Sequence, residues 1–457
     1  MTPSRLSRHA LLGALTFALA CSTESVLEVQ DPDVINPDQI TTAGGAEALR
    51  RGALSRFINA TSGGESFFLL GGLLADEYRS GDTFTERNET DRRTVQTSNA
   101  QVRAAFRLAY RARISAQQSV AVLRQFQADP YKIGEMYLVM AYIENLLAED
   151  ACSGAPLSDA NGTDVVYSKP KTMTEVLEVA LAHADSALRE ATGTSAEAVR
   201  VRNAASVVRG RMLLNLGRHA DAAAAVAQVP TAFEWANEHS TTTFQNGVWG
   251  LNNAAGRWIV SNGEGGNTIN FATAGDPRVP VCRGTGGVTT GAESLPACPA
   301  GTATRAFDSG ARGIPFFVQQ VWPARESPMA IISGVEARLI EAEAALKAGD
   351  ATKWLATLNA LRTRVTGLAP LADPGSATAR LDLQFRERAF WLFGRGYRLG
   401  DMRRLVRQYG RAAESVFPTG SWFKGGSFGG DLSLPIPQAE ENNPEFPAGQ
   451  ACLDRGA

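Results

Sequence analysis

The chain carries a cysteine, Cys21, at a position where its thiol could be covalently modified. Arg5 and Arg8 place positive charge near the start, and the uncharged, mostly apolar run Ala10–Ala20 leads directly to this cysteine. A charged start, a short apolar run and small residues at its end form the pattern of a secretory signal peptide. The run has 11 residues, whereas a membrane-spanning helix needs about 20. We therefore expect residues 1–20 to be the signal peptide of an exported protein.

The residues before Cys21 resemble the lipobox of bacterial lipoproteins. Leu19 and Ala20 fit that motif, and Ala18 stands where leucine is usual. In such proteins the signal is cut just before the cysteine, whose thiol receives diacylglycerol, and acyl chains such as palmitate anchor the product. Two or more chains hold a protein on a membrane stably, where one would not. The alternative is an ordinary cleaved signal followed by a cysteine that is there by chance.

Four further cysteines follow, an even number that favours pairing in an exported protein. Cys282 and Cys298 bracket a segment rich in glycine and threonine, so we predict a disulfide that closes this loop and removes about 3 kcal/mol of unfolded-chain entropy. Cys152 and Cys452 could form a second bond or be buried free thiols. The sequence has no Cys-x-x-Cys and only 4 histidines, which excludes a zinc site of normal spacing, so we predict no metal site.

Composition excludes other classes of function. Residues 1–20 hold two arginines and no acidic residue, so 43 basic and 47 acidic residues follow them, a net charge of −4. This balance gives no electrostatic basis for binding nucleic acid. No second apolar stretch approaches membrane-spanning length, so we expect a body outside the bilayer, tethered only at its N-terminus.

Enzyme motifs are also lacking. The sequence contains no His-Glu-x-x-His and no P-loop. Gly263–Gly266 does not open a helix after a strand, as a dinucleotide fingerprint would. A glycosidase needs two carboxylates, but local context marks no acidic pair for that role. We predict a non-enzymatic protein without catalytic residues or cofactor.

The elements that must position any site are mostly helices. An apolar piece at 67–74 leads into a polar loop at 76–82, and residues 411–457 are expected to lie against the body. The stretch Pro230–Val318 has little periodicity, and an irregular segment of this length is normally functional or a small subdomain. Helical periodicity covers residues 46–59, 99–126, 131–147, 173–190, 196–216, 220–229, 331–347, 352–366 and 377–408.

Two helix pairs resemble tetratricopeptide repeats, in which small residues let two antiparallel helices approach and glycine ends the first helix. Their equivalent glycines are 132 residues apart, so the repeats are split by an insertion. The alternative is two ordinary antiparallel helix hairpins. The residues at repeat spacing are Gly210, Leu213, Gly217 and Ala222 in the first pair, and Ala342, Ala345, Gly349 and Trp354 in the second.

Glu387–Arg404 resembles the signature helix of the SusD/RagB family of outer-membrane nutrient-uptake lipoproteins. Leu434–Gln438 is similar to the closing segment of that family, and Asp150–Leu157 to the end of its first large hairpin. The resemblance implies a mostly α fold, a SusD-like helical scaffold of split tetratricopeptide-like pairs with a large irregular insertion. One domain would span 21–457. Its parts would be a scaffold at about 38–229 and 331–409, an insertion at about 230–330 and a C-terminal wrap at 410–457.

For function, the resemblance implies a lipid-anchored protein of the outer membrane, exposed at the cell surface. It would bind a nutrient, an oligosaccharide or peptide, and deliver it to a partner TonB-dependent, SusC-like barrel transporter. Two alternatives stay open. One is a lipid-anchored helical-repeat adaptor for envelope complexes without a small ligand, and the other is a surface glycosidase.

Members of the family generally place ligand contacts on loops of the insertion and of the early segment near residue 80. Aromatic faces that stack on sugars, with amide or charged groups for hydroxyls, are the side chains that such a site needs. The alternative for Trp249 and Trp258 is that they fill small cores under a long loop. The candidate contacts are Trp249, Asn252, Asn253, Trp258, Asn267, Phe271, Trp322, Tyr78, Arg79 and Asp82.

The charged residues of Glu387–Arg404 favour a structural role over ligand contact. Opposite charges three or four residues apart stabilise a helix by about 0.2–0.5 kcal/mol per pair. We expect Asp401 to pair with Arg398 or Arg404 and to hold the turn at Gly394 and Gly396.

Overall fold

The computed structural model describes residues 40–161, 164–446 and 452–456. Cys21 and the signal peptide lie outside these residues, so the predictions about them are not tested by the structure. Within these residues, no helix combines the length and the apolar character that crossing a membrane requires.

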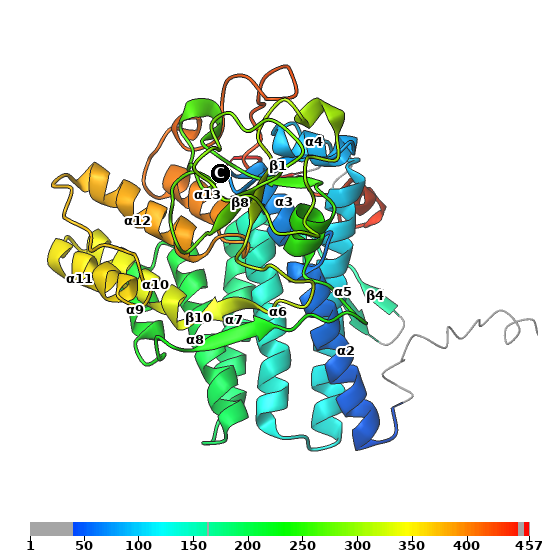
Figure 1. Cartoon of the computed structure of the whole chain (residues 1–457). Helices are drawn as coiled ribbons and strands as arrows, with labels where there is room; N and C mark the ends of the chain where they lie inside the picture. Colours follow the sequence, from blue (N-terminus) through cyan, green and yellow to red (C-terminus); the bar gives the residue numbers. More distant parts are fainter. Residues whose placement is uncertain (1–39, 162–163, 447–451, 457) are drawn as a thin grey trace, which may run out of the picture.

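The body of the molecule is helical, as the sequence predicts. Five long helices, α2, α5, α6, α7 and α8, stand side by side in its lower part (Figure 1). The α-helices are α2 (Ala43–Ser62), α3 (Phe67–Leu74), α4 (Thr85–Asp91), α5 (Ala100–Gln125), α6 (Pro130–Asp150), α7 (Met173–Glu190), α8 (Ala196–Asn215), α9 (His219–Val226), α10 (Gly334–Lys347), α11 (Ala351–Arg362), α12 (Ala377–Trp391) and α13 (Arg398–Arg407).

Local sequence explains where these helices begin and how closely they pack. The side chain of Asn99 accepts hydrogen bonds from the second and third residues of α5, and Thr172 forms a capping box with Glu175 at the start of α7. In α5, buried alanines recur every three or four residues along one face, from Ala105 to Ala116. Small side chains at this spacing let α2 and α6 pack closely against α5.

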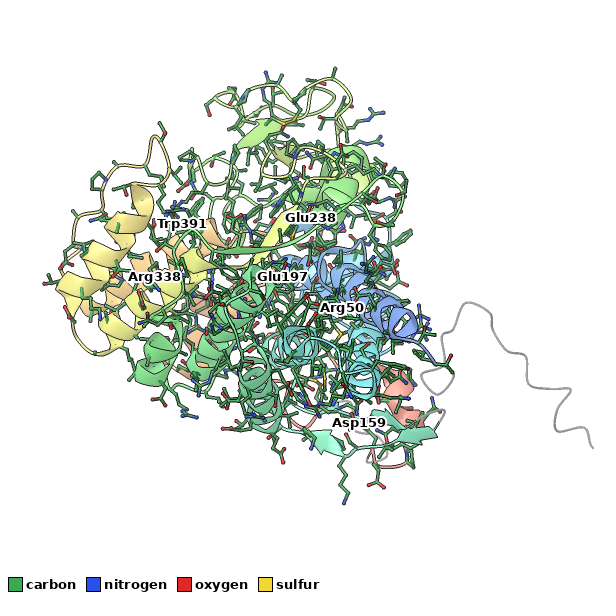
Figure 2. All side chains as sticks on the ribbon, turned by 90° about the horizontal axis from the view of Figure 1, so that it is seen from below. Arg50, Asp159, Glu197, Glu238, Arg338 and Trp391 are labelled. Atoms are coloured by element: carbon green, nitrogen blue, oxygen red, sulfur yellow. A yellow bond between two sulfur atoms is a disulfide. The ribbon has the colours of Figure 1, made fainter. Side chains whose placement is uncertain are left out.

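The helices pack in chain order, from α2–α5 through α8–α9. The chain then leaves the array after α9 and returns at α10, which packs on both α9 and α11. The two predicted repeat pairs are therefore direct neighbours in space, although 132 residues separate their glycines. Seen end-on in Figure 2, Arg50 of α2 and Arg338 of α10 lie toward opposite ends of the array.

Short antiparallel ladders form the rest of the regular structure. The ladder β6–β10 pairs the two ends of the insertion, which explains how the chain returns to α9. Within the described residues the ladders are β1 (Tyr78–Ser80) with β7 (Trp258–Val260), β2 (Ala155–Pro156) with β5 (Pro170–Lys171), β3 (Asp159–Asn161) with β4 (Asp164–Val166), β6 (Glu234–Asn237) with β10 (Met329–Ser333), and β8 (Val281–Arg283) with β9 (Phe317–Gln319). Short helices lie at η2 (Trp249–Ala254), η3 (Glu264–Gly266), η4 (Ser309–Ala311), η5 (Ala413–Ser415) and η6 (Gln438–Asn442).

Two expectations about local structure are wrong. Residues 76–82, predicted as a polar loop, contain strand β1, which pairs with β7 of the insertion and is largely buried. The helical pattern at 377–408 is broken into α12 and α13 at Gly394 and Gly396, which have φ angles of 68° and 76°. A side chain at Gly394 would overlap Tyr78, and one at Gly396 would overlap Phe68. The break thus lets the chain turn tightly against α3 and β1.

Buried ion pairs fix the turn between α12 and α13. Asp401 accepts hydrogen bonds from Arg388 at 2.8 and 2.9 Å and from Arg404 at 2.7 Å. The predicted pair of Asp401 with Arg404 is therefore confirmed. Arg398 instead donates to Asp76 at 2.6 and 2.8 Å, because its side chain points from α13 toward the end of α3. These carboxylates are buried, so their role is structural.

Disulfides join both the insertion and the C-terminal segment. Cys282 is bonded to Cys298, as predicted, with a sequence separation of 16. Cys152 is bonded to Cys452, with a separation of 300. Beside this second disulfide, Leu434 exchanges backbone hydrogen bonds of 2.8 Å with Asp150 and Cys152. The C-terminal segment therefore lies along the end of α6.

Candidate ligand-binding surface

Three of the predicted aromatic contacts belong to the core. Tyr78 of β1 and Trp258 of β7 are buried and meet edge to face with ring centroids 5.5 Å apart. Phe271 is also buried, between Phe390 and Phe393 at 5.2 and 5.0 Å. A ring enclosed on its faces cannot stack on a sugar, so the structure corrects the prediction for Tyr78, Trp258 and Phe271.

Two of the three predicted amides are also structural. Asn252 donates to the carbonyls of Trp258 at 2.7 Å and Phe317 at 3.1 Å, and it accepts from the backbone N–H of Gln319 at 2.9 Å. Asn253 donates to the carbonyl of Gln319 at 2.9 Å and accepts from its side chain at 2.6 Å. Both amides are buried between η2 and the strands β7 and β9. They satisfy backbone groups of the insertion and are not free for a ligand.

The other candidates from the insertion differ in burial: one is buried and two are half-buried. Trp322 is buried, with the guanidinium of Arg395 at 5.1 Å from its ring, so it too is corrected to a core residue. Trp249 is half-buried at the start of η2. Asn267 is half-buried and donates to the carbonyls of Glu414 at 2.6 Å and Phe417 at 2.8 Å. Trp249 and Asn267 stay predictions as ligand contacts.

Arg79 and Asp82, on and just after β1, are engaged in ion pairs. Arg79 is half-buried and pairs with Glu264, and burial lowers its pKa to about 10. Asp82 is buried and accepts from Arg87 and, at 2.6 Å, from Arg257. Asp82 therefore positions the cations around it and is not itself exposed to a ligand, which corrects that prediction.

Above Asp82, two phenylalanine rings are exposed side by side with Arg257. Phe84 and Phe307 are 43% and 47% exposed, a large fraction for such apolar side chains. The guanidinium of Arg257 lies 5.3 Å from the ring centroid of Phe84 and 4.0 Å from that of Phe307. We call Phe84, Arg257 and Phe307 the aromatic surface.

The aromatic surface is rigidly supported from three distant parts of the chain. The backbone N–H of Phe307 donates to the carbonyl of Gly256 at 2.8 Å, and that of Asp308 donates to Gly81 at 2.8 Å. The ammonium of Lys424 bridges Asp308 and the carbonyl of Asp82, at 2.8 and 2.7 Å. The backbone beside both rings is therefore fixed by contacts with other parts of the chain.

A polar pocket of about 290 Å³ opens beside the aromatic surface, along α4. Phe84 immediately precedes α4, so the same helix positions both features. Around the indole of Trp422 the pocket presents hydroxyl, amide, carboxylate and guanidinium groups. Its lining residues are Thr85, Asn88, Glu89, Arg92, Thr94, Gln96 and Trp422. We call this pocket and the aromatic surface together the α4 site.

Buried hydrogen bonds hold Trp422 in this pocket. Its indole N–H donates to Asp91 at 3.0 Å, and the same carboxylate oxygen accepts from the backbone N–H of Ser80 at 3.0 Å. Burial raises the pKa of Asp91 to about 6, although these two hydrogen bonds oppose the shift. Among the residues that the structure describes, no group of histidine, cysteine, aspartate or glutamate is arranged to hold a metal ion.

Sequence reasoning missed Phe84, Arg257, Phe307 and Trp422. Phe84 stands two residues after the candidate Asp82, and Arg257 precedes the candidate Trp258, so both lie next to predicted residues. The exposure of each side chain depends on how β1, β7 and the C-terminal segment pack. An unusual pairing of exposed aromatic and cationic side chains becomes visible only in the folded chain.

A comparison with family models finds no match, and a comparison with curated proteins finds none either. Solved structures do match. A SusD superfamily protein from Parabacteroides distasonis is 15% identical, over 90% of this chain and 100% of its own, with a TM-score of 0.64. One from Bacteroides fragilis is 15% identical, over 88% and 97%, with a TM-score of 0.63.

A further solved structure is that of a SusD-like carbohydrate binding protein from Bacteroides vulgatus. It is 14% identical, covers 79% of this chain and 82% of its own, and has a TM-score of 0.56. At this level of identity the likeness concerns the fold. The chain therefore has the fold of the SusD superfamily, as the resemblance of its C-terminal half implies.

Proposed function

We propose that the chain is a non-catalytic binding protein that takes an oligosaccharide at the α4 site. The observation that carries this proposal is the pair of exposed rings, Phe84 and Phe307, which lie on either side of Arg257 next to a polar pocket built around Trp422. Aromatic faces stack on the apolar faces of sugars, while amides and charges bond hydroxyls. The likeness to a structure described as a carbohydrate binding protein agrees with this choice.

The shape of the site favours an extended ligand. The α4 pocket is of a size for about one ring, since its volume lies at the lower limit of small-molecule sites. The aromatic surface continues from it over Phe84 to Phe307, so further rings of the same oligomer could lie along it. A peptide with aromatic or proline side chains is the competing ligand class, and the test below separates the two.

We further propose that acyl chains on Cys21 anchor the protein at the outer surface of the outer membrane. There it would pass its ligand to a TonB-dependent transporter. The support is the signal-like run before Cys21 and the SusD superfamily fold. A tether raises the effective concentration of the binder at its partner. Cys21→Ala should abolish partitioning into detergent, and unchanged partitioning would contradict the anchor.

Calorimetric titration of the mature protein with panels of neutral oligosaccharides and of short peptides tests the ligand class. Each aromatic contact contributes about 0.5–1.5 kcal/mol, so Phe84→Ala with Phe307→Ala should weaken oligosaccharide binding about 5- to 150-fold. Tyr167→Ala is the matched control, because Tyr167 is an equally exposed ring (47%) near β4.

Three results would contradict the oligosaccharide proposal. One is unchanged affinity in the double variant, and another is binding confined to the peptide panel. The third is a lack of binding in both panels while the protein still co-purifies with a transporter, which would favour the adaptor function.

A further inference from the structure

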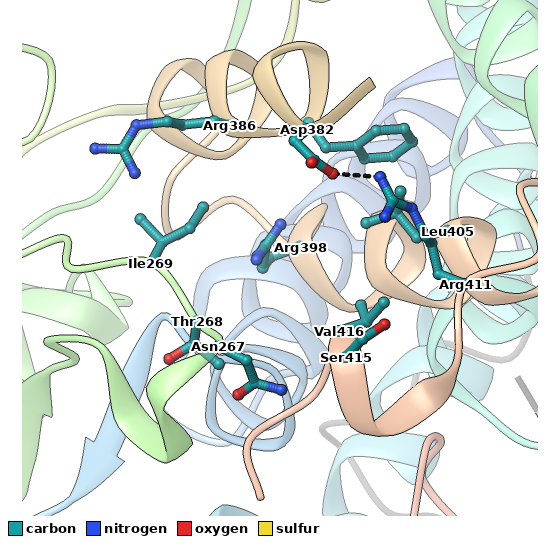
Figure 3. A pocket seen from close by; sticks show the side chains of 11 residues that line it. Asn267, Thr268, Ile269, Asp382, Arg386, Arg398, Leu405, Arg411, Ser415 and Val416 are labelled. Carbon is teal, nitrogen blue, oxygen red and sulfur yellow. Dashed lines mark hydrogen bonds and ion pairs between the residues drawn. The ribbon is translucent and has the colours of Figure 1, made fainter. Parts of the chain in front are cut away.

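A second pocket, of about 430 Å³, lies between the insertion and the α12–α13 turn (Figure 3). It shares no lining residue with the α4 pocket. Its lining combines apolar side chains with an unusual number of arginines. The residues are Asn267, Thr268, Ile269, Asp382, Phe385, Arg386, Arg398, Leu405, Arg411, Ser415 and Val416.

The charge lining this pocket is unbalanced. Three guanidiniums, those of Arg386, Arg398 and Arg411, face a single lining carboxylate, that of Asp382. Figure 3 shows Arg386 and the Asp382–Arg411 pair on opposite sides of the space, with Arg398 between them. Arg398 is already paired with the buried Asp76. No carboxylate that lines the pocket forms an ion pair with Arg386 within the described residues, because Asp382 is paired with Arg411.

Arg386 has no ion pair or side-chain hydrogen bond within residues 40–161, 164–446 and 452–456. Its guanidinium makes a cation–π contact with Phe390, at 4.9 Å from the ring centroid. Burial lowers the pKa of Arg386, and the nearby guanidiniums of Arg278 and Arg398 lower it further, against the opposing effects of Asp276 and Glu387. Arg386 is nevertheless exposed, so a ligand in the pocket can reach its guanidinium, and an anion there would be attracted by the three lining arginines.

Two further groups at the rim are available for a ligand. Arg411 and Asp382 form a bond of 2.5 Å, but Asp382 is largely exposed. Exposed ion pairs contribute little to stability, so Arg411 can exchange this partner for a ligand at small cost. The side-chain oxygen of Asn267 is buried and lacks a hydrogen-bond partner, while its nitrogen is held by two carbonyls. It can accept one hydrogen bond from a ligand hydroxyl or N–H.

The rest of the lining is apolar. Ile269, Phe385, Leu405 and Val416 come from the insertion, α12, α13 and the C-terminal segment respectively. They offer a non-polar surface to the carbon atoms of a ligand whose anionic end meets the arginines. The volume falls within the range of small-molecule sites, which begins at about 300 Å³.

We propose that this pocket binds a small organic ligand through a carboxylate, with Arg386 as its ion-pair partner and Asn267 as an acceptor. A guanidinium matches the planar carboxylate with two parallel hydrogen bonds. The arginines would bind a phosphate equally well. The four apolar side chains, however, favour a ligand with a hydrocarbon or sugar-ring body. Two sources share this chemistry, an acidic sugar and the free C-terminus of a short peptide.

Calorimetric titration of the mature protein distinguishes the two sources. The probes are galacturonic acid against galactose, and a tripeptide with a free carboxylate against its C-terminal amide. We expect at least one acid to bind at least 10-fold more tightly than its neutral counterpart, with an affinity that falls as salt rises. Equal binding of acid and neutral forms, or no binding of either acid, would overturn the proposal.

Variants locate the binding. Arg386→Gln should weaken binding of the acid at least 10-fold, and Arg386→Lys should retain part of it because the charge stays. Arg189→Gln removes an exposed arginine of α7 and should change nothing. Phe84→Ala with Phe307→Ala tests the α4 site separately. Loss of acid binding in that double variant, with Arg386→Gln unaffected, would place the acid at the α4 site and overturn this proposal.

Discussion

The helical scaffold and the insertion between β6 and β10 satisfy their buried polar groups in different ways. In the scaffold, charged side chains of separate helices pair with one another. Arg388 meets Asp401, and Arg211 donates to Glu336 at 2.6 and 2.9 Å. In the insertion, the side-chain amides of Asn252 and Asn253 meet backbone groups of neighbouring strands.

The reason lies in the backbone. A helix bonds its own N–H and C=O groups internally, so its polar side chains are free to link one helix to the next. An irregular segment leaves backbone groups that must each find a partner. A side-chain amide can donate and accept hydrogen bonds at once. One asparagine can therefore supply the backbone hydrogen bonds that a neighbouring strand would otherwise provide. Ion pairs thus connect one helix to another in the scaffold. In the insertion, side-chain amides bond backbone groups that would otherwise need a neighbouring strand.

The two disulfides should show the largest difference between the regions. In the chain-entropy account, the cost of removing a disulfide grows with the loop that it closes. Cys152→Ser with Cys452→Ser opens a loop of 300 residues, and Cys282→Ser with Cys298→Ser one of 16. We expect the first pair of changes to lower the free energy of unfolding by about 5 kcal/mol and the second by about 3 kcal/mol. Denaturant unfolding under non-reducing conditions measures both, and a larger loss for the shorter loop would contradict the expectation.

The ion pairs of the scaffold give the next test. Asp401→Ala leaves the guanidiniums of Arg388 and Arg404 with less compensating charge in a buried site, so we expect unfolding to become easier by about 4 kcal/mol. Asp373→Ala is the control, because Asp373 pairs with Arg380 at the exposed surface. The control should show no measurable change. Equal midpoints of urea unfolding for the two variants would show that the buried ion pair contributes no more to stability than the exposed one.

A third test concerns Glu77, where the two regions meet. Its carboxyl accepts from the N–H of Gly394 at 2.7 Å, and its carbonyl accepts from Ser261 of the insertion at 3.0 Å. Burial raises the pKa of Glu77 to about 8. The folded chain therefore keeps a proton that the unfolded chain releases, and this contribution to stability is lost as pH rises from about 5 to 8.

Glu77→Gln cannot ionise but still accepts from Gly394. Relative to this variant, the natural chain should lose about 3 kcal/mol of stability between pH 5 and pH 8 and little more above pH 8. Unfolding midpoints of both proteins at several pH values give this difference. A constant difference across the range would mean that the carboxyl of Glu77 is already ionised at pH 5.

The same comparison explains what could be predicted from the sequence. The helix at Met173–Glu190 was predicted with the observed bounds, because helical periodicity is a local signal. The turn at Gly394 and Gly396 was expected from the charged residues, although the helical periodicity ran across it. The contact with Tyr78 that requires glycine at position 394 follows from no local pattern. The pairing of Arg398 with Asp76 spans 322 residues, beyond any local pattern.

The candidate site was predicted by segment but not by side chain. Residues around 80 and 257 do border the α4 site, yet Asp82 lies beneath it and Phe84 on it. Two residues along the chain separate a buried carboxylate from an exposed ring. That distinction depends on Phe307 and Lys424, which reach the site from distant parts of the chain.

The substitution Asn252→Ala should have the smallest effect, and it tests the difference between scaffold and insertion most directly. It removes one acceptor and two donor contacts of the insertion and should cost about 2 kcal/mol. Because no helix of the scaffold uses this amide, the cost should be local. Hydrogen exchange should accelerate at backbone amides of β7 and β9 while those of α5 and α6 keep their protection. If α5 and α6 lost protection equally, the insertion would unfold together with the scaffold, and the amides would hold the whole molecule as the buried ion pairs do.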